Sequence, residues 1–393
     1  MAAPTKIAII GLSASAKTGW ASNAHLPYLL SERGTSKFRI VALLNSSVQA
    51  AKDAIAAYNL PSPETIKTYG NPEDLAADPD VELVVNSTRV DNHYKTILPS
   101  VQKAKDVFVE WPLAHDVQHA RELTELAAKS KGQRTVVGAQ GRLSPLADKL
   151  REVIRSGRIG KVVSSEVRAS GGTNSSDSLP EGLAYFADRK IGGNFYTILA
   201  GHLTDMVLSV LSDFDHAQEV QGSFHLQHPT QKLFDPATKE VVGTVQSDVP
   251  DLVLLNGRLQ ESEHVQKDAL FSLQLRRGSP FPGEPSLVWL IYGDKGAIRL
   301  VAPESTHITI GTPNDPQVFE VVDYETDKVE QVAWEFADWQ VELPFPARNI
   351  GAIYEEYAAA KESGDRHAPK YQTFEQALRR LEQLNEPLSK WKA

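Results

Sequence analysis

The feature that most constrains this chain is a short apolar run near its N-terminus and the loop of small residues after it. Residues 6–10 read Lys-Ile-Ala-Ile-Ile and stop at Gly11, a pattern typical of a buried parallel strand. From Ser13 onward, small side chains would let a pyrophosphate approach backbone N–H groups at a helix start. The dinucleotide fingerprint asks for three glycines, and this chain has Gly11, Ser13 and Ala16 in those places. The loop alone is therefore compatible with a dinucleotide site or with an ordinary strand-to-helix turn.

Strand and helix patterns alternate along the first third of the chain. Apolar runs typical of strands lie at residues 38–44, near 68, and at 81–86, 107–110 and 135–139. Helical patterns separate them at residues 24–32, 50–58, 94–104 and 117–129. Crossovers of this length imply right-handed connections and a doubly wound parallel sheet. We therefore expect a dinucleotide-binding Rossmann domain over residues 1–142.

The pattern changes in the remaining part of the chain, residues 143–393. After a helix at 144–156, strand-like runs follow closely at 162–168, 220–226, 252–259, 270–275, 287–292 and 297–301. One helix interrupts them at 193–211, and two more lie at 349–361 and 373–388. We expect a mostly antiparallel β-sheet domain with helices. Its C-terminal helices pack back on this sheet or on the first domain. A chain of 393 residues also exceeds the size of one hydrophobic core.

Composition excludes several classes of function. The net charge of −9 and the absence of a basic stripe argue against direct nucleic-acid binding. The chain has no cysteine, which excludes disulfides and thiolate chemistry. His225 and His228 flank a strand end without a third ligand at metal spacing, so no metal site is expected. No signal-peptide pattern and no apolar run of the roughly 20 residues needed to span a membrane is present. We expect no membrane contact and a cytoplasmic location, with nuclear entry left open.

Polar residues follow the ends of several expected strands, where ligands bind in open parallel sheets. After the strand at 38–44 come Asn45, Ser46 and Ser47, which offer neither a carboxylate for ribose hydroxyls nor a cation for a 2′-phosphate. They would bond the ribose, bond the phosphate, or cap the next helix; NAD against NADP stays open, and the missing carboxylate favours NADP. The NAD(P)-contacting residues expected from all such positions are Gly11, Ser13, Ala14, Ala16, Lys17, Trp20, Asn45, Ser46, Ser87, His93, Glu110, Trp111 and Pro112.

Two of these positions have alternatives. Glu110 ends the strand at 107–110 and would be a costly buried charge without a functional role, and Pro112 often follows a cis bond in this context. His93 begins the helix after the strand at 81–86, and is either directed at the same crevice or an exposed helix-start histidine.

These motifs resemble the glucose–fructose oxidoreductase/inositol dehydrogenase (GFO/IDH/MocA) family, and within it the branch of the fungal galactose-pathway repressor. The residues that carry the resemblance are Gly11-Leu12, Lys17, Gly19-Trp20, His25, Asn92-His93-Tyr94, Phe108-Val109-Glu110-Trp111-Pro112, Gln140-Gly141-Arg142, Ser144-Pro145, Gly192-Gly193-Asn194, Gly201-His202 and Asp205. The resemblance extends to about residue 301. It implies a Rossmann domain, a C-terminal open-sheet domain that carries substrate and the oligomer interface, and a homodimer formed through that sheet.

The chain departs from the family at the acid/base residues. Family enzymes typically read Glu-Lys-Pro where this chain has Trp111, and their helix carries an Asp where this chain has Ile198, four residues before His202. His202 remains as a base with a pKa near neutrality, or as a core residue of an apolar helix. Lys190 is a candidate for the missing cation, and Tyr185 for a phenol.

Two functions follow from this set of residues. The first is an NAD(P)-dependent oxidoreductase that acts on a sugar-like or other hydroxylated small molecule, with His202 moving the proton. The second is a non-catalytic dinucleotide-binding transcriptional regulator, whose bound nucleotide tunes contact with a regulatory protein partner. Loss of the family Lys and Asp supports the regulator, and the retained His202 supports the enzyme.

Overall fold

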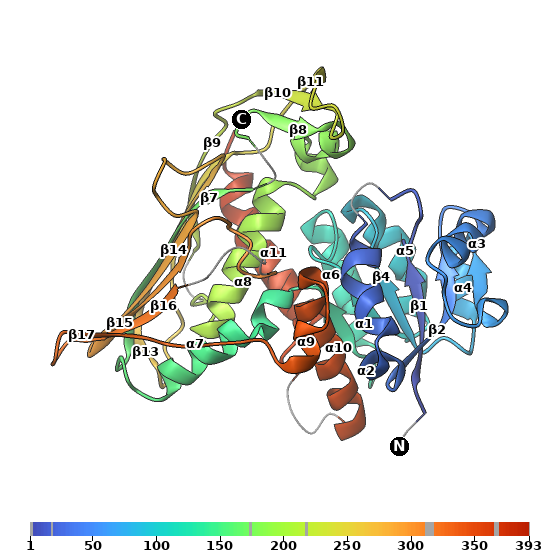
Figure 1. Ribbon diagram of the computed structural model, residues 1–393, viewed down its shortest axis with the longest axis horizontal. Coiled ribbons are helices and arrows are strands. Elements are labelled where there is room, and N and C mark those ends of the chain that lie inside the picture. The colour runs from blue at the N-terminus through green and yellow to red at the C-terminus, as the bar shows by residue number, and fades with distance from the viewer. Residues whose placement is uncertain are drawn as a thin grey trace. The chain divides into compact units, whose positions relative to one another are not determined.

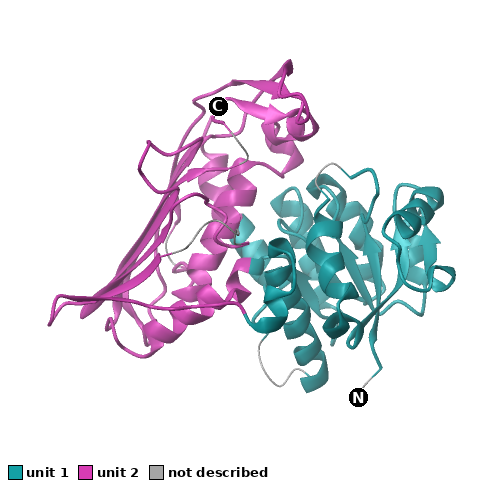
Figure 2. Cartoon of the chain, viewed as in Figure 1, with its two compact units in different colours: residues 1–140, 337–381 teal, residues 141–336, 382–393 magenta. Residues whose placement is uncertain are grey.

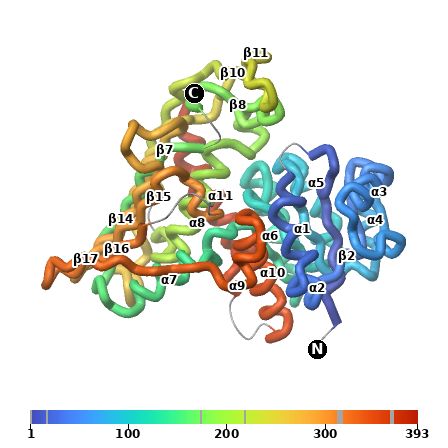
Figure 3. Tube along the Cα trace, in the orientation of Figure 1, coloured from blue at the N-terminus to red at the C-terminus, as the bar shows by residue number. Residues whose placement is uncertain are grey.

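The computed structural model describes residues 3–16, 19–172, 175–216, 219–310, 318–364 and 369–392. The chain divides into two compact units, shown in Figure 2. Unit 1 consists of Met1–Gln140 and Ala337–Leu381, and unit 2 of Gly141–Phe336 and Glu382–Ala393. Figure 3 traces the resulting path, in which the chain leaves unit 1, builds unit 2 and later returns to unit 1.

Unit 1 is built on a parallel six-stranded sheet with the order β3-β2-β1-β4-β5-β6 (Figure 1). This order is that of a Rossmann fold, as predicted. The strands are β1 (Thr5–Ile10), β2 (Phe38–Leu44), β3 (Lys67–Tyr69), β4 (Leu83–Asn86), β5 (Asp106–Val109) and β6 (Thr135–Val137). The connecting helices are η1 (Ala21–His25), α1 (Leu26–Leu30), α2 (Glu32–Thr35), α3 (Val48–Ala57), η2 (Pro63–Thr65), α4 (Pro72–Ala77), α5 (Val90–Gln102) and α6 (Val117–Ala128).

The central strands explain why this sheet is parallel and covered on both faces. β1 and β4 are almost continuous apolar runs, and nearly all of their side chains are buried. Strands of this kind form where crossover helices cover both faces of a sheet. Directly after β1, Gly11 has φ +95°, and a Cβ there would lie 2.6 Å from the Ser87 carbonyl oxygen. Only glycine therefore fits at this first turn.

Helices from the C-terminal third complete the core of unit 1. These are α9 (Asp338–Val341), α10 (Phe345–Ser363) and the first part of α11 (Phe374–Ser389). On α10, the Tyr354 ring stacks on Tyr28 with centroids 5.4 Å apart. Tyr357 on the same helix donates a hydrogen bond to Asp106 over 2.7 Å. Of the two packings expected for this tail, α10 therefore takes the one against the Rossmann sheet.

Unit 2 is built on an eight-stranded sheet with the order β17-β16-β15-β14-β7-β13-β12-β9. Only the pairing of β7 with β13 is parallel in this sheet, so the predicted mostly antiparallel domain is confirmed. Its strands are β7 (Val162–Gly171), β9 (Gln221–His225), β12 (Leu252–Arg258), β13 (Val265–Arg277), β14 (Leu287–Gly293), β15 (Gly296–Ala302), β16 (Val318–Asp323) and β17 (Lys328–Gln331). Figure 1 shows α7 (Pro145–Arg155) and α8 (Gly201–Val210) along one face of the sheet.

A small second sheet, β11-β10-β8, also belongs to unit 2. Its strands are β8 (Ser178–Pro180), β10 (Thr230–Phe234) and β11 (Val241–Gln246), and the short helices η4 (Glu181–Ala187) and η5 (Arg189–Ile191) follow β8. These three strands, with β16 and β17, are absent from the sequence prediction. Most side chains of β8, β10, β11 and β17 are partly or fully exposed, so these strands lack the buried apolar alternation that identifies a strand. In β16 buried and half-buried side chains do alternate, and the prediction missed it.

The helix predicted at 193–211 forms in two parts. Its first turns, η6 (Phe195–Ala200), are a π-helix, and α8 continues from Gly201. The segment after the β1 loop, η1, is also a π-helix. Such turns are rare and occur frequently at functional sites. No helix of the described residues is both long and apolar enough to cross a membrane.

Candidate functional site

Side chains from β2 and α3 hold the loop that follows β1. The Asn45 amide donates to the Leu12 carbonyl over 2.8 Å, and the Tyr58 hydroxyl donates to the Ser13 carbonyl over 3.0 Å. Ser13 is half-buried, whereas Ala14, Ser15 and Ala16 are exposed. Two consecutive carbonyl groups are thus fixed by side chains, which preorganises the loop for a ligand bound by backbone N–H groups.

The indole N–H of Trp20, just after this loop, has no acceptor within the described chain. The Trp20 residue is half-buried, whereas its Nε1 is itself buried. A buried N–H without an acceptor costs about 1–3 kcal/mol. A phosphate or ribose oxygen would accept this hydrogen bond, so the loop fits a dinucleotide. Lys17, also expected here, lies outside the described residues.

The segment after β2 both caps a helix and braces the loop. The Ser47 hydroxyl accepts from the Ala50 N–H and caps α3. The Asn45 amide nitrogen makes a second bond, to the Ala50 carbonyl over 3.2 Å. Ser46 is exposed at the same edge. The helix-capping alternative therefore holds for Ser47, while Asn45 joins β2, α3 and the loop.

The carboxyl end of β5 carries a buried chain of three polar side chains. His25 Nε2 lies 2.9 Å from Glu110 Oε1, and His25 Nδ1 lies 2.9 Å from the Tyr354 hydroxyl. His25 and Tyr354 are 0% exposed and Glu110 is 8% exposed. Burial, and to a lesser degree the Glu110 charge, raise the pKa of Tyr354 well above its usual value. The phenol therefore keeps its proton and donates to His25, whose Nε2–H in turn donates to the carboxylate.

Sequence reasoning noted His25 only as part of the resemblance and did not select Tyr354. The residues are 85 and 329 positions from their partners, and no local pattern connects such distant positions. An apolar setting for His25 was the only available signal, because a buried histidine needs partners for both nitrogens.

The two residues after Glu110 are buried beside His93. The bond between Trp111 and Pro112 is cis, and both side chains are buried. His93 Nδ1 faces the Pro112 carbonyl at 2.9 Å, and its Nε2 faces the Thr88 carbonyl at 3.0 Å. Burial is the largest cause that lowers the pKa of His93. His93 is therefore buried rather than exposed at its helix start, and both ring nitrogens face backbone carbonyls.

Ser87 lies at the neighbouring strand end. It follows β4, is half-buried, and its N–H donates to the Ile10 carbonyl over 3.0 Å. Unit 1 thus brings the ends of β1, β2, β4 and β5 to one edge of its sheet, with Gly11, Asn45, Ser87 and Glu110 following them.

The predicted catalytic residues lie in unit 2. His202 is the second residue of α8 and is half-buried, one turn after the half-buried Ile198. Tyr185 lies in η4 with its ring edge-on to Phe186, at 4.9 Å between centroids. Lys190 lies in η5 with an exposed side chain. His202 is therefore not one of the fully buried residues of α8.

A buried ion pair joins the start of unit 2 to α8. Arg142 Nη2 and Nε donate to the two carboxylate oxygens of Asp205 over 2.6 and 3.0 Å. Asp205 is the acidic residue of α8, and this bidentate contact occupies both of its oxygens.

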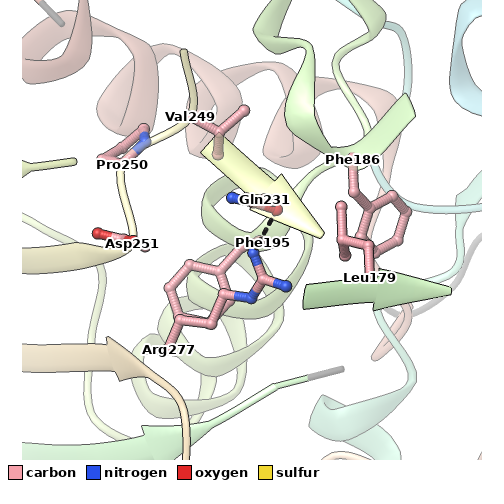
Figure 4. A pocket seen from close by; sticks show the side chains of 8 residues that line it. All are labelled: Leu179, Phe186, Phe195, Gln231, Val249, Pro250, Asp251 and Arg277. Carbon is pink, nitrogen blue, oxygen red and sulfur yellow. Dashed lines mark hydrogen bonds between the residues drawn. The ribbon is translucent and has the colours of Figure 1, made fainter. Parts of the chain in front are cut away.

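Unit 2 also contains a pocket, shown in Figure 4, that includes none of the predicted site residues. Arg277 lies in it and donates to Gln231 over 2.7 Å. Its second nitrogen donates to the Ser178 carbonyl. These bonds tie β13 to β10 and β8, so Arg277 holds the small sheet in place. The lining residues are Leu179, Phe186, Phe195, Gln231, Val249, Pro250, Asp251 and Arg277.

One group of potential metal ligands occurs in unit 1, although the sequence predicted none. Ligand atoms of His115, Asp116 and His119 lie within 4.8 Å of one another. Asp116 caps α6 through the His119 N–H and also contacts both imidazoles. Helix capping and these hydrogen bonds account for the arrangement.

Comparison with known proteins agrees with the two-part architecture. Residues 5–138 match the profile of the oxidoreductase family with an NAD-binding Rossmann fold, GFO/IDH/MocA. Residues 145–302 match the C-terminal domain of Gal80p. The chain therefore resembles the GFO/IDH/MocA family over its first third and the C-terminal domain of Gal80p over the part that follows.

The relatives of this chain include both expected kinds of protein. Dehydrogenase aclE of Aspergillus oryzae is 29% identical over 305 residues, which cover 76% of this chain and 77% of that protein. The galactose/lactose metabolism regulatory protein GAL80 of Saccharomyces cerevisiae is 26% identical over 306 residues, covering 76% of this chain and 67% of that protein.

Two kinds of solved structure share the fold. A super-repressor mutant of Gal80p from S. cerevisiae superposes with a TM-score of 0.82 at 21% identity, covering 98% of this chain and 95% of that one. Levoglucosan dehydrogenase in complex with NADH and L-sorbose gives a TM-score of 0.73 at 15% identity, covering 99% and 98%.

Proposed function

We propose that this protein binds a nicotinamide dinucleotide in unit 1 and transfers a hydride between it and a hydroxylated small molecule, such as a sugar or polyol. The observation that carries this proposal is the braced loop after β1, where Asn45 and Tyr58 fix two carbonyls and Trp20 Nε1 is buried without a described acceptor. The match of residues 5–138 to an NAD-binding oxidoreductase family and the dehydrogenase relative support it.

In this proposal, the acid/base chemistry of the reaction is carried out by His202 of unit 2. A bound nicotinamide supplies the hydride acceptor or donor. His202 takes the proton of the substrate hydroxyl, because an imidazole can act as a general base and this one is only half-buried. Asp205 does not replace the acid missing at Ile198, since Arg142 engages both of its oxygens. Lys190 and Tyr185 of unit 2 are the candidates for a cation and a phenol, and Glu110 and Trp111 lie at the proposed cofactor site of unit 1.

Asn45 supports NAD rather than NADP, although the sequence favoured NADP. Its amide nitrogen donates to two carbonyl groups, of Leu12 and Ala50, which uses both amide hydrogens. The remaining polar atom, Oδ1, only accepts. An acceptor suits ribose hydroxyls and repels a 2′-phosphate. NAD should therefore bind more tightly than NADP, and Ser46→Arg, which adds a cation beside Asn45, should reverse this order in calorimetric titrations.

A second candidate function is a non-catalytic, dinucleotide-dependent regulator, as the GAL80 relative suggests. The observation that favours it is Trp111, whose buried indole stands where family enzymes typically carry a lysine. An indole cannot exchange a proton with a reacting hydroxyl. In this alternative the bound nucleotide would alter contact with a protein partner.

One experiment separates the two functions. The purified chain is titrated with NAD and NADP, and then screened with sugars and polyols for a change in reduced-nicotinamide absorbance. Turnover that His202→Ala abolishes, with nucleotide affinity unchanged, supports the enzyme; Lys239→Ala, at an exposed turn of unit 2, is the control. Tight binding without turnover in either protein supports the regulator.

The open face of the eight-stranded sheet supports a homodimer. Figure 1 shows no helix of the described chain on the face opposite α7 and α8. Leu254 is 42% exposed there. The residues paired with Leu254 on successive strands form one row across this face of the sheet. They are Gln274, Arg168, Val288, Val301 and Val318. A row of this composition suits burial against a second copy of the same face.

A further inference from the structure

At the β5 side of the dinucleotide site proposed above lies the carboxylate of Glu110, of which one oxygen is hydrogen-bonded within the described chain and the other is not. Glu110 Oε1 accepts from His25 at 2.9 Å. Oε2 has no hydrogen-bond partner among the residues that the structure describes, although the Glu110 side chain is only 11% exposed. This oxygen is not among the fully buried atoms that lack a partner, so it is an accepting group at the sheet edge that a donor from outside the chain can reach.

The surroundings of Oε2 leave room for the carboxylate at the sheet edge. Gly138, just after β6, has no side chain, and a Cβ there would lie 2.5 Å from Oε2. Its N–H donates to the Val109 carbonyl, which anchors this glycine against the end of β5. The position of the carboxylate thus depends on glycine at 138 as well as on His25.

His25 is itself held from the opposite side. Tyr354 of α10 donates to Nδ1, and the rings of Phe108 and Tyr354 lie 5.2 and 5.9 Å from the imidazole. His25 also ends η1, the π-helix that begins just after the β1 loop. The imidazole therefore connects the segment after the phosphate loop, the end of β5 and the C-terminal helix α10.

We propose that His25 and Tyr354 are positioning residues that fix Glu110 so that its Oε2 accepts a hydrogen bond from the nicotinamide-riboside half of the dinucleotide. This inference rests on the proposed dinucleotide binding. That half offers two kinds of donor, the carboxamide N–H and the ribose hydroxyls. Adenine nucleotides that end at the pyrophosphate, such as ADP, lack this half of the molecule and therefore both of these donors.

Binding of three ligands tests the inference in the full chain. NAD, ADP-ribose and ADP are titrated calorimetrically into the wild-type protein and into His25→Leu, His25→Gln and Tyr354→Phe. We expect His25→Leu to weaken NAD by about ten-fold and to leave ADP unchanged. Glutamine keeps an N–H donor toward Glu110, so His25→Gln should restore most of the affinity, and Tyr354→Phe should give a smaller loss.

ADP-ribose then identifies the donor. If ADP-ribose weakens with NAD, the ribose hydroxyls donate; if it behaves as ADP does, the carboxamide donates. Equal weakening of NAD and ADP would overturn the inference by showing a general structural effect, as would unchanged NAD affinity in a folded His25→Leu protein. Gly138→Ala repeats the test without changing the hydrogen-bonding groups. Failure of wild-type protein to bind any of the three ligands would instead refute the proposed function.

Discussion

Arg142 and Asp205, 63 positions apart, form a buried bidentate ion pair that ties the first residues of unit 2 to α8. Arg142 also presents its carbonyl to Arg151 of α7. The pair therefore holds together the helices that cover one face of the large sheet, next to the turn that carries His202.

Breaking this pair from one side should destabilise unit 2 strongly. Asp205→Ala leaves a buried guanidinium without its charge partner, at a cost of about 3–5 kcal/mol. Urea unfolding followed by far-UV circular dichroism measures the loss. The double variant Arg142→Met/Asp205→Leu should recover much of it, and a double variant as unstable as Asp205→Ala would contradict this account.

His93 should make stability depend on pH. Burial lowers the pKa of His93 below its usual 6.5, so the unfolded chain takes up a proton that the folded chain refuses. The contribution is complete above pH 6.5 and is lost as the pH falls toward the folded-state value, by up to about 1.4 kcal/mol per pH unit. In denaturant titrations across this range, His93→Gln should lose less stability than the wild type; parallel curves would refute the assignment.

Tyr58 should affect ligand binding through the loop alone. Tyr58→Phe removes the hydroxyl that holds the Ser13 carbonyl, a bond worth about 0.5–1.5 kcal/mol. Dinucleotide affinity should fall by about two- to ten-fold. The control is Tyr324→Phe, at an exposed tyrosine of unit 2, which should leave the affinity unchanged.

The sheet face should determine the oligomeric state. Leu254→Glu places a charge on the exposed row of β12 and should convert a dimer to a monomer in light scattering coupled to size exclusion. Val241→Glu, at a more exposed apolar position on β11 outside this sheet, is the control. A wild-type monomer at all concentrations would remove the dimer proposal.

The sequence predicted the Rossmann sheet because its information is local. The buried runs of β1, β2 and β4 identify themselves by composition, and their alternation with helices fixes the topology. The same local reasoning placed Gly11 and Asn45 at strand ends. It could not determine what Asn45 does, because that depends on the carbonyls of Leu12 and Ala50 turning toward its amide.

Other features of the site and of the fold could not be predicted from the sequence, for a different reason. The contact of Tyr354 with His25 spans 329 positions, and neither residue has a sequence neighbour that indicates the other. The strand β17 is fully exposed and forms only because β16 offers it hydrogen bonds. Tertiary pairing, rather than residue preference, makes both features.

The division of unit 1 into two stretches of chain has a consequence for synthesis. During translation the segment that ends at Gln140 emerges first, yet α10 with Tyr354 follows only after all of Gly141–Phe336. Until unit 2 has left the ribosome, α10 is not available to the nascent Rossmann domain. The rings of Tyr28, Phe38 and His25, which α10 covers in the folded protein, therefore stay uncovered. The dinucleotide binding proposed above should therefore be acquired last, and a ribosome-bound fragment that lacks α10 should not bind NAD.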